Sequence, residues 1–160
     1  MANVELRPFR AEDSTWLINA HAELYARDEG FDDSFGALVA SIVEDFNNNH
    51  DPTCEQGWIA LRDGVRGGSI FCVRQDAQTA KLRLFLLLPE LRGQGSGRKM
   101  LDTCMSYARA RGYRRMELYT HESHRAACAL YAAAGWQLAD SRPVRSFGCD
   151  LVEQSWKITL

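Results

Sequence analysis

A glycine-rich segment between an apolar run and an amphipathic run carries the clearest chemical signal in this sequence. The segment Pro89–Lys99 follows the largely apolar residues Leu82–Leu88 and precedes Met100–Arg111, an order that predicts strand, turn and helix. Alternate glycines let backbone N–H groups turn inward around an anion, and a helix N-terminus adds unpaired donors and about half a positive charge. This chemistry binds phosphate. The glycines are Gly93, Gly95 and Gly97, and the mobile positive charges are on Arg92, Arg98 and Lys99.

The spacing of these glycines decides among the known phosphate-binding loops. A dinucleotide fingerprint, G-x-G-x-x-G, requires glycine where Arg98 stands, and a P-loop counted from Gly93 has the same requirement. Both are therefore excluded. The pattern R/Q-x-x-G-x-G/A is met by Arg92, Gly95 and Gly97, which resembles the acetyl-CoA pyrophosphate loop of the GNAT N-acetyltransferase superfamily. The alternative is a solvated glycine turn ahead of a helix.

A second segment resembles the same superfamily. Residues Ala127–Trp136 are similar to its A-x-x-L-Y-x-x-x-G-F segment, with tryptophan in the last place. The resemblance covers about residues 82–138, and the first eighty residues match only in the coarse order of their elements. Within the superfamily, Tyr25–Asp32 and Pro143–Trp156 are similar to a subgroup that often follows a winged-helix MarR-type regulator in the same chain.

The resemblance implies an α/β (α+β) fold, with a central mixed sheet of six or seven strands, a splayed parallel pair and about four flanking helices. It also implies that acetyl-CoA is the co-substrate. A splayed strand leaves unpaired N–H and C=O groups that the pantetheine amides can satisfy, which assigns this role to the backbone of Leu87 and Leu88. The resemblance gives the pyrophosphate to Arg92, Gly93, Gln94, Gly95, Ser96, Gly97 and Arg98.

Two further positions take their expected roles from the resemblance. At position 124 the superfamily commonly has an asparagine that contacts the cofactor, whereas this sequence has His124, which can donate to a cofactor oxygen or cover the helix N-terminus. Tyr131 corresponds to the tyrosine that often protonates the departing CoA thiolate. A phenol with a pKa of about 10 and a thiol with a pKa of about 8.5 share a proton readily at short range. The alternative for Tyr131 is an aromatic side chain packed against the cofactor.

Acetyl transfer to an amine also requires a deprotonated nucleophile, because an ammonium group has no lone pair. Direct uptake of the proton by ordered water is as compatible with the sequence as any side-chain base. Asp28 and Glu29 lie where the superfamily places part of its acceptor site, and with Tyr119 they are predicted to bind the acceptor. Acidic residues there can equally cap a helix. The candidate bases are Asp28, Glu29, Asp32, Asp33, Glu117, His121 and Glu122.

Local patterns predict the elements that must position these residues, within a single domain over residues 1–160. The helix after the loop acts as a crossover, which makes the strands on either side of it parallel. Strands are predicted at 4–7, 57–62, 67–74, 81–88, 116–120, 136–139 and 150–159. Helices are predicted at about 12–28, 32–46 and 100–111, and a fourth begins within 121–123.

Composition narrows the choice of partners and of compartment. A net charge of -2 with 25% charged residues gives no general basic field for nucleic acid or for an anionic membrane. The five cysteines are an odd number without a C-x-x-C pair, which favours reduced thiols in a cytoplasm. The residues Met1–Glu5 lack a leader pattern, and no stretch is long enough to span a membrane. His121–His124 is not H-E-x-x-H, so no metal is expected.

These observations predict a cytoplasmic N-acetyltransferase that moves acetyl from acetyl-CoA to a primary amine of a small molecule by direct attack. Two alternatives stay open. One is a protein or peptide acetyltransferase acting on lysine or on a chain N-terminus, and the other is a non-catalytic acyl-CoA-binding sensor. A homodimer is expected only by analogy with the superfamily.

Overall fold

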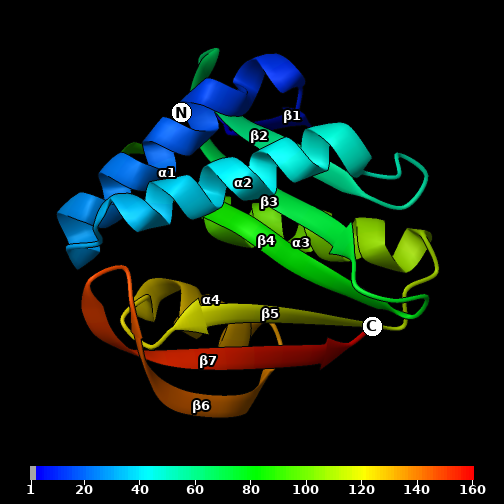
Figure 1. Ribbon diagram of the computed structural model, residues 1–160. Helices are drawn as coiled ribbons and strands as arrows, with labels where there is room; N and C mark the ends of the chain where they lie inside the picture. Colours follow the sequence, from blue (N-terminus) through cyan, green and yellow to red (C-terminus); the bar gives the residue numbers. More distant parts are fainter. Residues whose placement is uncertain (1–2) are drawn as a thin grey trace.

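The computed structural model describes residues 3–160, so Met1 and Ala2 of the segment considered for a leader lie outside it. Seven strands form one mixed sheet in the order β1-β2-β3-β4-β5-β7-β6 (Figure 1). β4 and β5 are parallel, and the other neighbours are antiparallel. The predicted mixed sheet with one parallel pair is therefore confirmed. The strands are β1 (Glu5–Pro8), β2 (Gln56–Arg62), β3 (Val65–Arg74), β4 (Thr79–Leu87), β5 (Arg115–His121), β6 (Gln137–Ser146) and β7 (Cys149–Thr159).

Four α-helices cover the sheet, α1 (Ser14–Glu29), α2 (Asp33–Asn49), α3 (Ser96–Ala110) and α4 (Arg125–Ala133). α1 and α2 lie in front of the sheet in the view of Figure 1, and α3 lies behind it. Short 3₁₀ turns, Ala11–Asp13 and Pro89–Leu91, precede α1 and the glycine-rich loop.

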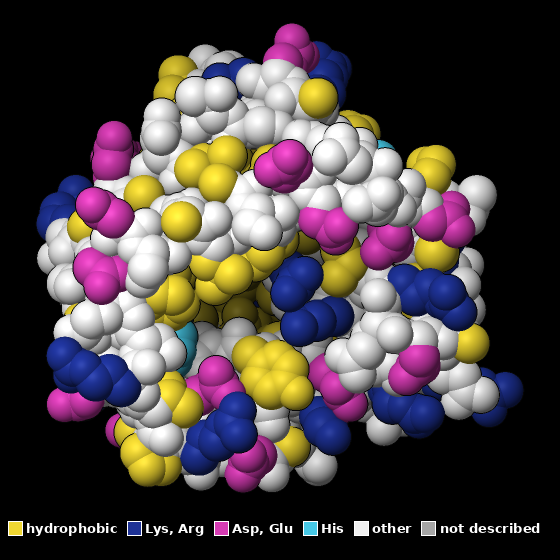
Figure 2. All heavy atoms as spheres, in the orientation of Figure 1, with side chains coloured by type: hydrophobic (Ala, Val, Ile, Leu, Met, Phe, Trp, Pro, Cys, Tyr) yellow, Lys and Arg dark blue, Asp and Glu magenta, His cyan; other side chains and the backbone are white. Residues whose placement is uncertain are grey.

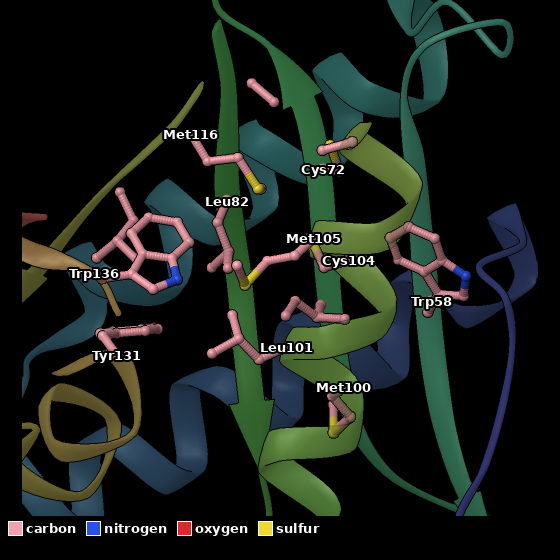
Figure 3. Close-up of a cluster of buried hydrophobic side chains, with 14 of the residues drawn as sticks. Trp58, Cys72, Leu82, Met100, Leu101, Cys104, Met105, Met116, Tyr131 and Trp136 are labelled. Atoms are coloured by element: carbon pink, nitrogen blue, oxygen red, sulfur yellow. The ribbon is translucent and has the colours of Figure 1, made fainter. Parts of the chain in front are cut away.

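A hydrophobic core lies on each face of the sheet. On the α3 face, the helix contributes residues that repeat at helical spacing, and Figure 3 shows them meeting the side chains of the central strands. Tyr131 of α4 and Trp136 lie side by side in the same core, with ring centroids 5.7 Å apart. α4 therefore shares the α3 face. On the opposite face, the second core consists of Leu17, Val39, Val43, Phe46 and Phe71.

Several element boundaries differ from the predicted ones by one to seven residues, and three of them have a clear cause or bear on the loop. α4 begins at Arg125, because the N–H of Glu122 still donates to Val152 of β7 and keeps the chain in the sheet. β6 runs to Ser146, since its polar residues pair with β7 along an edge where solvent can reach them. α3 begins at Ser96, four residues before the predicted start.

A buried carboxylate joins three N-terminal elements. Asp13 is 0% exposed and accepts two hydrogen bonds from the guanidinium of Arg7, at 2.8 Å each. It also accepts from Nε of Arg66 at 2.9 Å and from the N–H of Arg10 at 2.8 Å. The hydrogen bonds from Arg7 lower the pKa of Asp13 to about 2, against the opposing effect of burial. Asp13 thereby fixes β1 and the start of α1 to β3.

Among residues 3–160, no helix is long and apolar enough to cross a membrane. Within the same residues, no group of three or more His, Cys, Asp or Glu side chains is placed to hold a metal ion.

Candidate active site

The two parallel strands diverge soon after they meet. β4 and β5 pair over only three positions, Thr79–Lys81 with Arg115–Glu117, although β4 continues to Leu87 and β5 to His121. The register between β3 and β4 shifts near Leu84, whose φ is 50°. Such an irregularity bends a strand and increases its twist. The second half of β4 therefore turns away from β5 and leaves a wedge between the strands.

A pocket of about 430 Å³ occupies this wedge. The end of α1, the second half of β4, the glycine-rich loop and the start of α4 form its walls. Apolar side chains supply part of the lining, and charged side chains come from α1 and the loop. The lining includes Tyr25, Asp28, Glu29, Phe85, Leu87, Arg92, Gly97, His124 and Ala127.

Two helix N-termini at this pocket lack a side-chain cap. α3 follows Gly95, and its first regular backbone bond runs from Lys99 to the Gly95 carbonyl at 3.0 Å. α4 follows His124, whose side chain does not cap the helix, and the N–H of Cys128 donates to the His124 carbonyl at 3.0 Å. The first N–H groups of both helices therefore have no partner within their helix. Two such ends beside one pocket favour an anionic ligand.

The loop before α3 is shaped by glycines and held by a distant arginine. Gly93 and Gly95 have φ values of 79° and 75°, which side chains rarely adopt. Arg62 of β2 donates to the Glu90 carbonyl at 2.6 Å and to the side-chain oxygen of Gln94. The turn is thus fixed relative to β2 independently of any ligand.

Four of the residues predicted to hold the cofactor line this pocket. They are Leu87, Arg92, Gly97 and His124. Leu88 does not line it. Its N–H donates to the Gly67 carbonyl of β3 at 2.8 Å, and its side chain lines a separate hollow. Along an antiparallel strand, the backbone N–H and C=O groups of successive residues point alternately toward and away from the neighbouring strand. Since Leu88 bonds to β3, the N–H and C=O of Leu87 point away from β3, toward the wedge.

The other predicted loop residues lie beside the pocket. Gly93, Gln94, Gly95 and Ser96 form the turn and the helix start, and Ser96 is buried. Arg98 pairs with Asp102 one turn later on α3, at 2.9 Å. Arg92 donates from Nε to the Leu87 carbonyl at 3.0 Å, and Nη2 lies 3.8 Å from Asp28.

His124 is a neutral side chain between the ends of β5 and α1. Its Nδ1 lies 3.2 Å from the Thr120 hydroxyl, and its Nε2 lies 3.5 Å from a carboxylate oxygen of Glu29. Burial, with a smaller contribution from His121, lowers the pKa of His124 to about 4. The effect of burial on this pKa therefore exceeds any effect of the Glu29 carboxylate. The contact between His124 and Glu29 is thus not an ion pair at neutral pH.

A second hollow of about 250 Å³ adjoins the first and shares Tyr25, Phe85, His124 and Ala127 with it. Figure 2 shows a depression in the face of the molecule beneath α2, with a hydrophobic floor and basic side chains at its edge. We call this second hollow, which Phe35, Lys81, Arg83, Tyr119 and Tyr131 help to line, the acceptor-side hollow. α1, α2, β4 and β5 all contribute to its lining.

Tyr131 lines the acceptor-side hollow and is 3% exposed. Its ring lies 6.3 Å from that of Phe85, a residue common to both hollows. Burial raises the pKa of the Tyr131 phenol well above its ordinary value. The hydroxyl therefore stays protonated throughout the neutral range and can act as a proton donor.

The predicted acceptor-binding residues lie in two different places. Asp28 and Glu29 line the wedge pocket, whereas Tyr119 lines the acceptor-side hollow and is 56% exposed. Asp32 caps α2 by accepting from the Ser34 N–H at 2.9 Å, as the capping alternative describes. Of the other candidate bases, His121 alone also lines the acceptor-side hollow.

Sequence reasoning missed two residues at the meeting point of the hollows, Tyr25 and Phe85. The Tyr25 ring lies 4.9 Å from that of His124, and burial raises the pKa of Tyr25 to about 12. Its position on the apolar stripe of α1 indicates only a core residue. Arg62, which braces the loop, also had no local signal.

Comparison with known proteins gives a consistent result. A model of the acetyltransferase (GNAT) family matches residues 16–136. The mycothiol acetyltransferase of Beutenbergia cavernae is 34% identical over 132 residues, which cover 79% of this chain and 41% of that protein. N-alpha-acetyltransferase 80 of Mus musculus is 42% identical over 50 residues, 31% of this chain and 15% of that protein. The chain thus spans less than half the length of either relative.

Solved structures share the fold. An acetyltransferase of the GNAT family from Staphylococcus aureus Mu50 superimposes with a TM-score of 0.81 at 16% identity, covering 99% of both chains. The yncA protein of Salmonella typhimurium, solved with its cofactor acetyl-CoA, gives 0.75 at 17% identity, covering 99% of this chain and 94% of that one. With the family match over most of its length, this chain belongs to the GNAT acetyltransferase family.

Proposed function

We propose that this chain transfers an acetyl group from acetyl-CoA to the primary amine of a small molecule by direct attack within the wedge. The observation that carries the proposal is the wedge pocket, with an uncapped helix N-terminus from α3 and another from α4 beside it. Phosphate oxygens would accept from the unpaired N–H groups, and Arg92 would add a positive charge. The free N–H of Leu87 would serve a pantetheine amide or the developing oxyanion.

The donor site is tested by two glycine substitutions of matched geometry. Gly95→Ala is expected to weaken acetyl-CoA binding roughly tenfold, because an L side chain at positive φ costs about 1–2 kcal/mol and deforms the turn. Gly64→Ala in the β2–β3 turn carries the same strain, since φ is 77° there and 75° at Gly95, and neither Cβ meets an atom within 4 Å. Calorimetric titration with acetyl-CoA measures both. Equal Kd values for the two variants would count against a binding role for the loop.

The proposed chemistry assigns one proton to each of two side chains. The amine nitrogen attacks the thioester carbonyl, the carbon–sulfur bond breaks, and the Tyr131 hydroxyl donates its proton to the departing sulfur. Glu29, whose carboxylate lines the wedge pocket, receives the proton that the amine loses. Binding both substrates in adjoining hollows lets proximity lower the barrier without a covalent acetyl-enzyme.

Glu29→Gln is expected to lower kcat/KM roughly tenfold near neutral pH, because the amide cannot take up a proton. The deficit should shrink as the pH rises, since more of the amine is then already deprotonated. Glu23→Gln on the exposed side of α1 is the matched control. A pH profile of CoA release checks the prediction. A Glu29→Gln profile identical to that of the wild type would mean that water, and not Glu29, takes up the proton that the amine loses.

A small acceptor is supported by contacts next to the acceptor-side hollow, around its lining residue Phe35. The turn between α1 and α2 contacts the turn between β6 and β7, with the Phe31 and Phe147 rings 4.9 Å apart. The N–H of Asp32 also donates to the Phe147 carbonyl at 3.0 Å. Figure 1 shows these two turns side by side at one end of the wedge. An extended peptide would need a groove continuing past this end, so the contacts favour a small amine over a protein substrate.

A further inference from the structure

Two basic side chains of β4 line the acceptor-side hollow. Lys81 and Arg83 are two residues apart on a strand, so they project from the same face of the sheet. Both are partly buried. Among residues 3–160, neither has a carboxylate within ion-pair distance. The directed contact of Lys81 is with the Tyr119 ring, whose centroid lies 5.0 Å from Nζ.

The neighbouring carboxylates are engaged elsewhere. Glu153 lines the same hollow but accepts from Arg142 at 2.9 Å. Glu117 accepts from Gln75 at 2.8 Å and lies 3.4 Å from Lys157. Burial and the repulsion of Arg83 lower the pKa of Lys81, and together they outweigh the opposing attraction of Glu117 and Glu153. Among residues 3–160, the two cations on the wall of the hollow therefore have no ion pair of their own, although Glu117 is the neighbour of Lys81 across the strands.

We infer that the acceptor carries an anionic group beside its amine, and that Arg83 and Lys81 bind this group. The inference rests on the proposed function and names the class of its acceptor. A guanidinium matches a carboxylate with two parallel hydrogen bonds, and an ammonium adds a point charge. The acceptor is thus an amino acid or a closely similar zwitterion.

The position of Arg83 on β4 relates the proposed anion site to the junction of the two hollows. Arg83 precedes Phe85 by two residues on β4, across the irregularity at Leu84, and Phe85 lies where the two hollows meet. A carboxylate at Arg83 therefore leaves the amine near the thioester end of the wedge. Glu29 on the far side of this point is negatively charged and attracts the ammonium form. Phe35, Leu38 and Ile42 of α2 form an apolar wall for the rest of the acceptor.

Matched pairs of amines test the inference. Acetyl-CoA-dependent CoA release is measured with leucine and isoamylamine, with phenylalanine and phenethylamine, and with β-alanine and propylamine. Each carboxylate-bearing member is expected to show a kcat/KM at least about tenfold higher, because only it makes charge-assisted hydrogen bonds to Arg83 and Lys81. The aminophosphonate analogue of leucine separates recognition of a carboxylate from recognition of a phosphate-like group.

Arg83→Gln is expected to remove this preference by raising KM for the carboxylate-bearing amines, with little change for the counterparts that lack a carboxylate and an unchanged Kd for acetyl-CoA. Arg109→Gln, an exposed arginine on α3, is the matched control. Equal turnover of both members of every pair, or an equal loss for both in Arg83→Gln, overturns the inference and leaves the proposed function standing. Failure of every amine to release CoA overturns the proposed function, and the inference with it.

Discussion

Replacing Tyr131 with phenylalanine is expected to lower kcat about 100-fold, because a positioned general acid typically contributes 100-fold or more. The ring of Tyr131 packs among Phe85, Trp136 and Trp156, and phenylalanine can keep those contacts. The Kd for acetyl-CoA should therefore stay nearly constant. The raised pKa of the phenol does not disqualify it as an acid, since burial also raises the pKa of the CoA thiol that forms when the thiolate takes up the proton.

Steady-state kinetics with a saturating amine measure this change, and calorimetry measures the Kd. Tyr113→Phe is the control, because it removes another hydroxyl from a buried tyrosine, one that donates to the Cys54 carbonyl at 2.9 Å. Its kcat should match that of the wild type. Full activity in Tyr131→Phe would mean that water or another side chain protonates the departing thiolate. Tyr25 carries a phenol at the meeting point of the hollows.

Asp13→Asn is expected to lower the free energy of unfolding by about 3 kcal/mol, because breaking a buried ion pair leaves its partners with poor solvation. Arg7 and Arg66 keep 22% and 35% of their side chains exposed, so water relieves part of this loss. Urea denaturation followed by circular dichroism gives the number. Asp150→Asn removes an exposed partner of Arg145 and should lower the free energy of unfolding far less, because water screens this pair. Equal losses in the two variants would contradict the structural role of Asp13.

The depressed pKa of Asp13 also predicts the pH dependence. The folded-state pKa of about 2 lies below the unfolded value, so this carboxylate contributes its stability above an unfolded pKa of about 3.9. The contribution is lost as the pH falls from about 5 through about 2. Wild type should therefore lose more stability than Asp13→Asn over this window, and parallel losses would show that the carboxylate is not the group responsible.

The fold was predicted from the resemblance carried by the glycine spacing of the loop and by the segment Ala127–Trp136, because each pattern is contiguous in sequence. The positions of Arg92 and Gly97 in the pocket followed from the same pattern. The backbone that makes the wedge was not predictable in this way. It depends on the irregularity near Leu84, a leucine at positive φ, which is not a residue that favours this conformation.

The residues of the acceptor-side hollow could not be predicted as one site, because segments far apart in the sequence form it. The prediction placed the acidic residues before α2 in one group, whereas the structure separates Glu29, beside the wedge, from Asp32, which caps α2. Lys81 and Arg83 alternate with apolar residues in a strand, a pattern that sequence alone assigns to a solvated face. That these two side chains line a hollow could not be predicted, because the hollow exists only where β5 diverges from β4 beneath α2.

The most direct test of the account is the formation of acetylated amine, measured by mass spectrometry, together with CoA release from the wild-type chain supplied with acetyl-CoA and the matched amines. The account predicts equal amounts of acetylated amine and free CoA, both dependent on the chain. Tight binding of acetyl-CoA without CoA release with any amine would contradict it, and would identify the chain as a non-catalytic acyl-CoA-binding module.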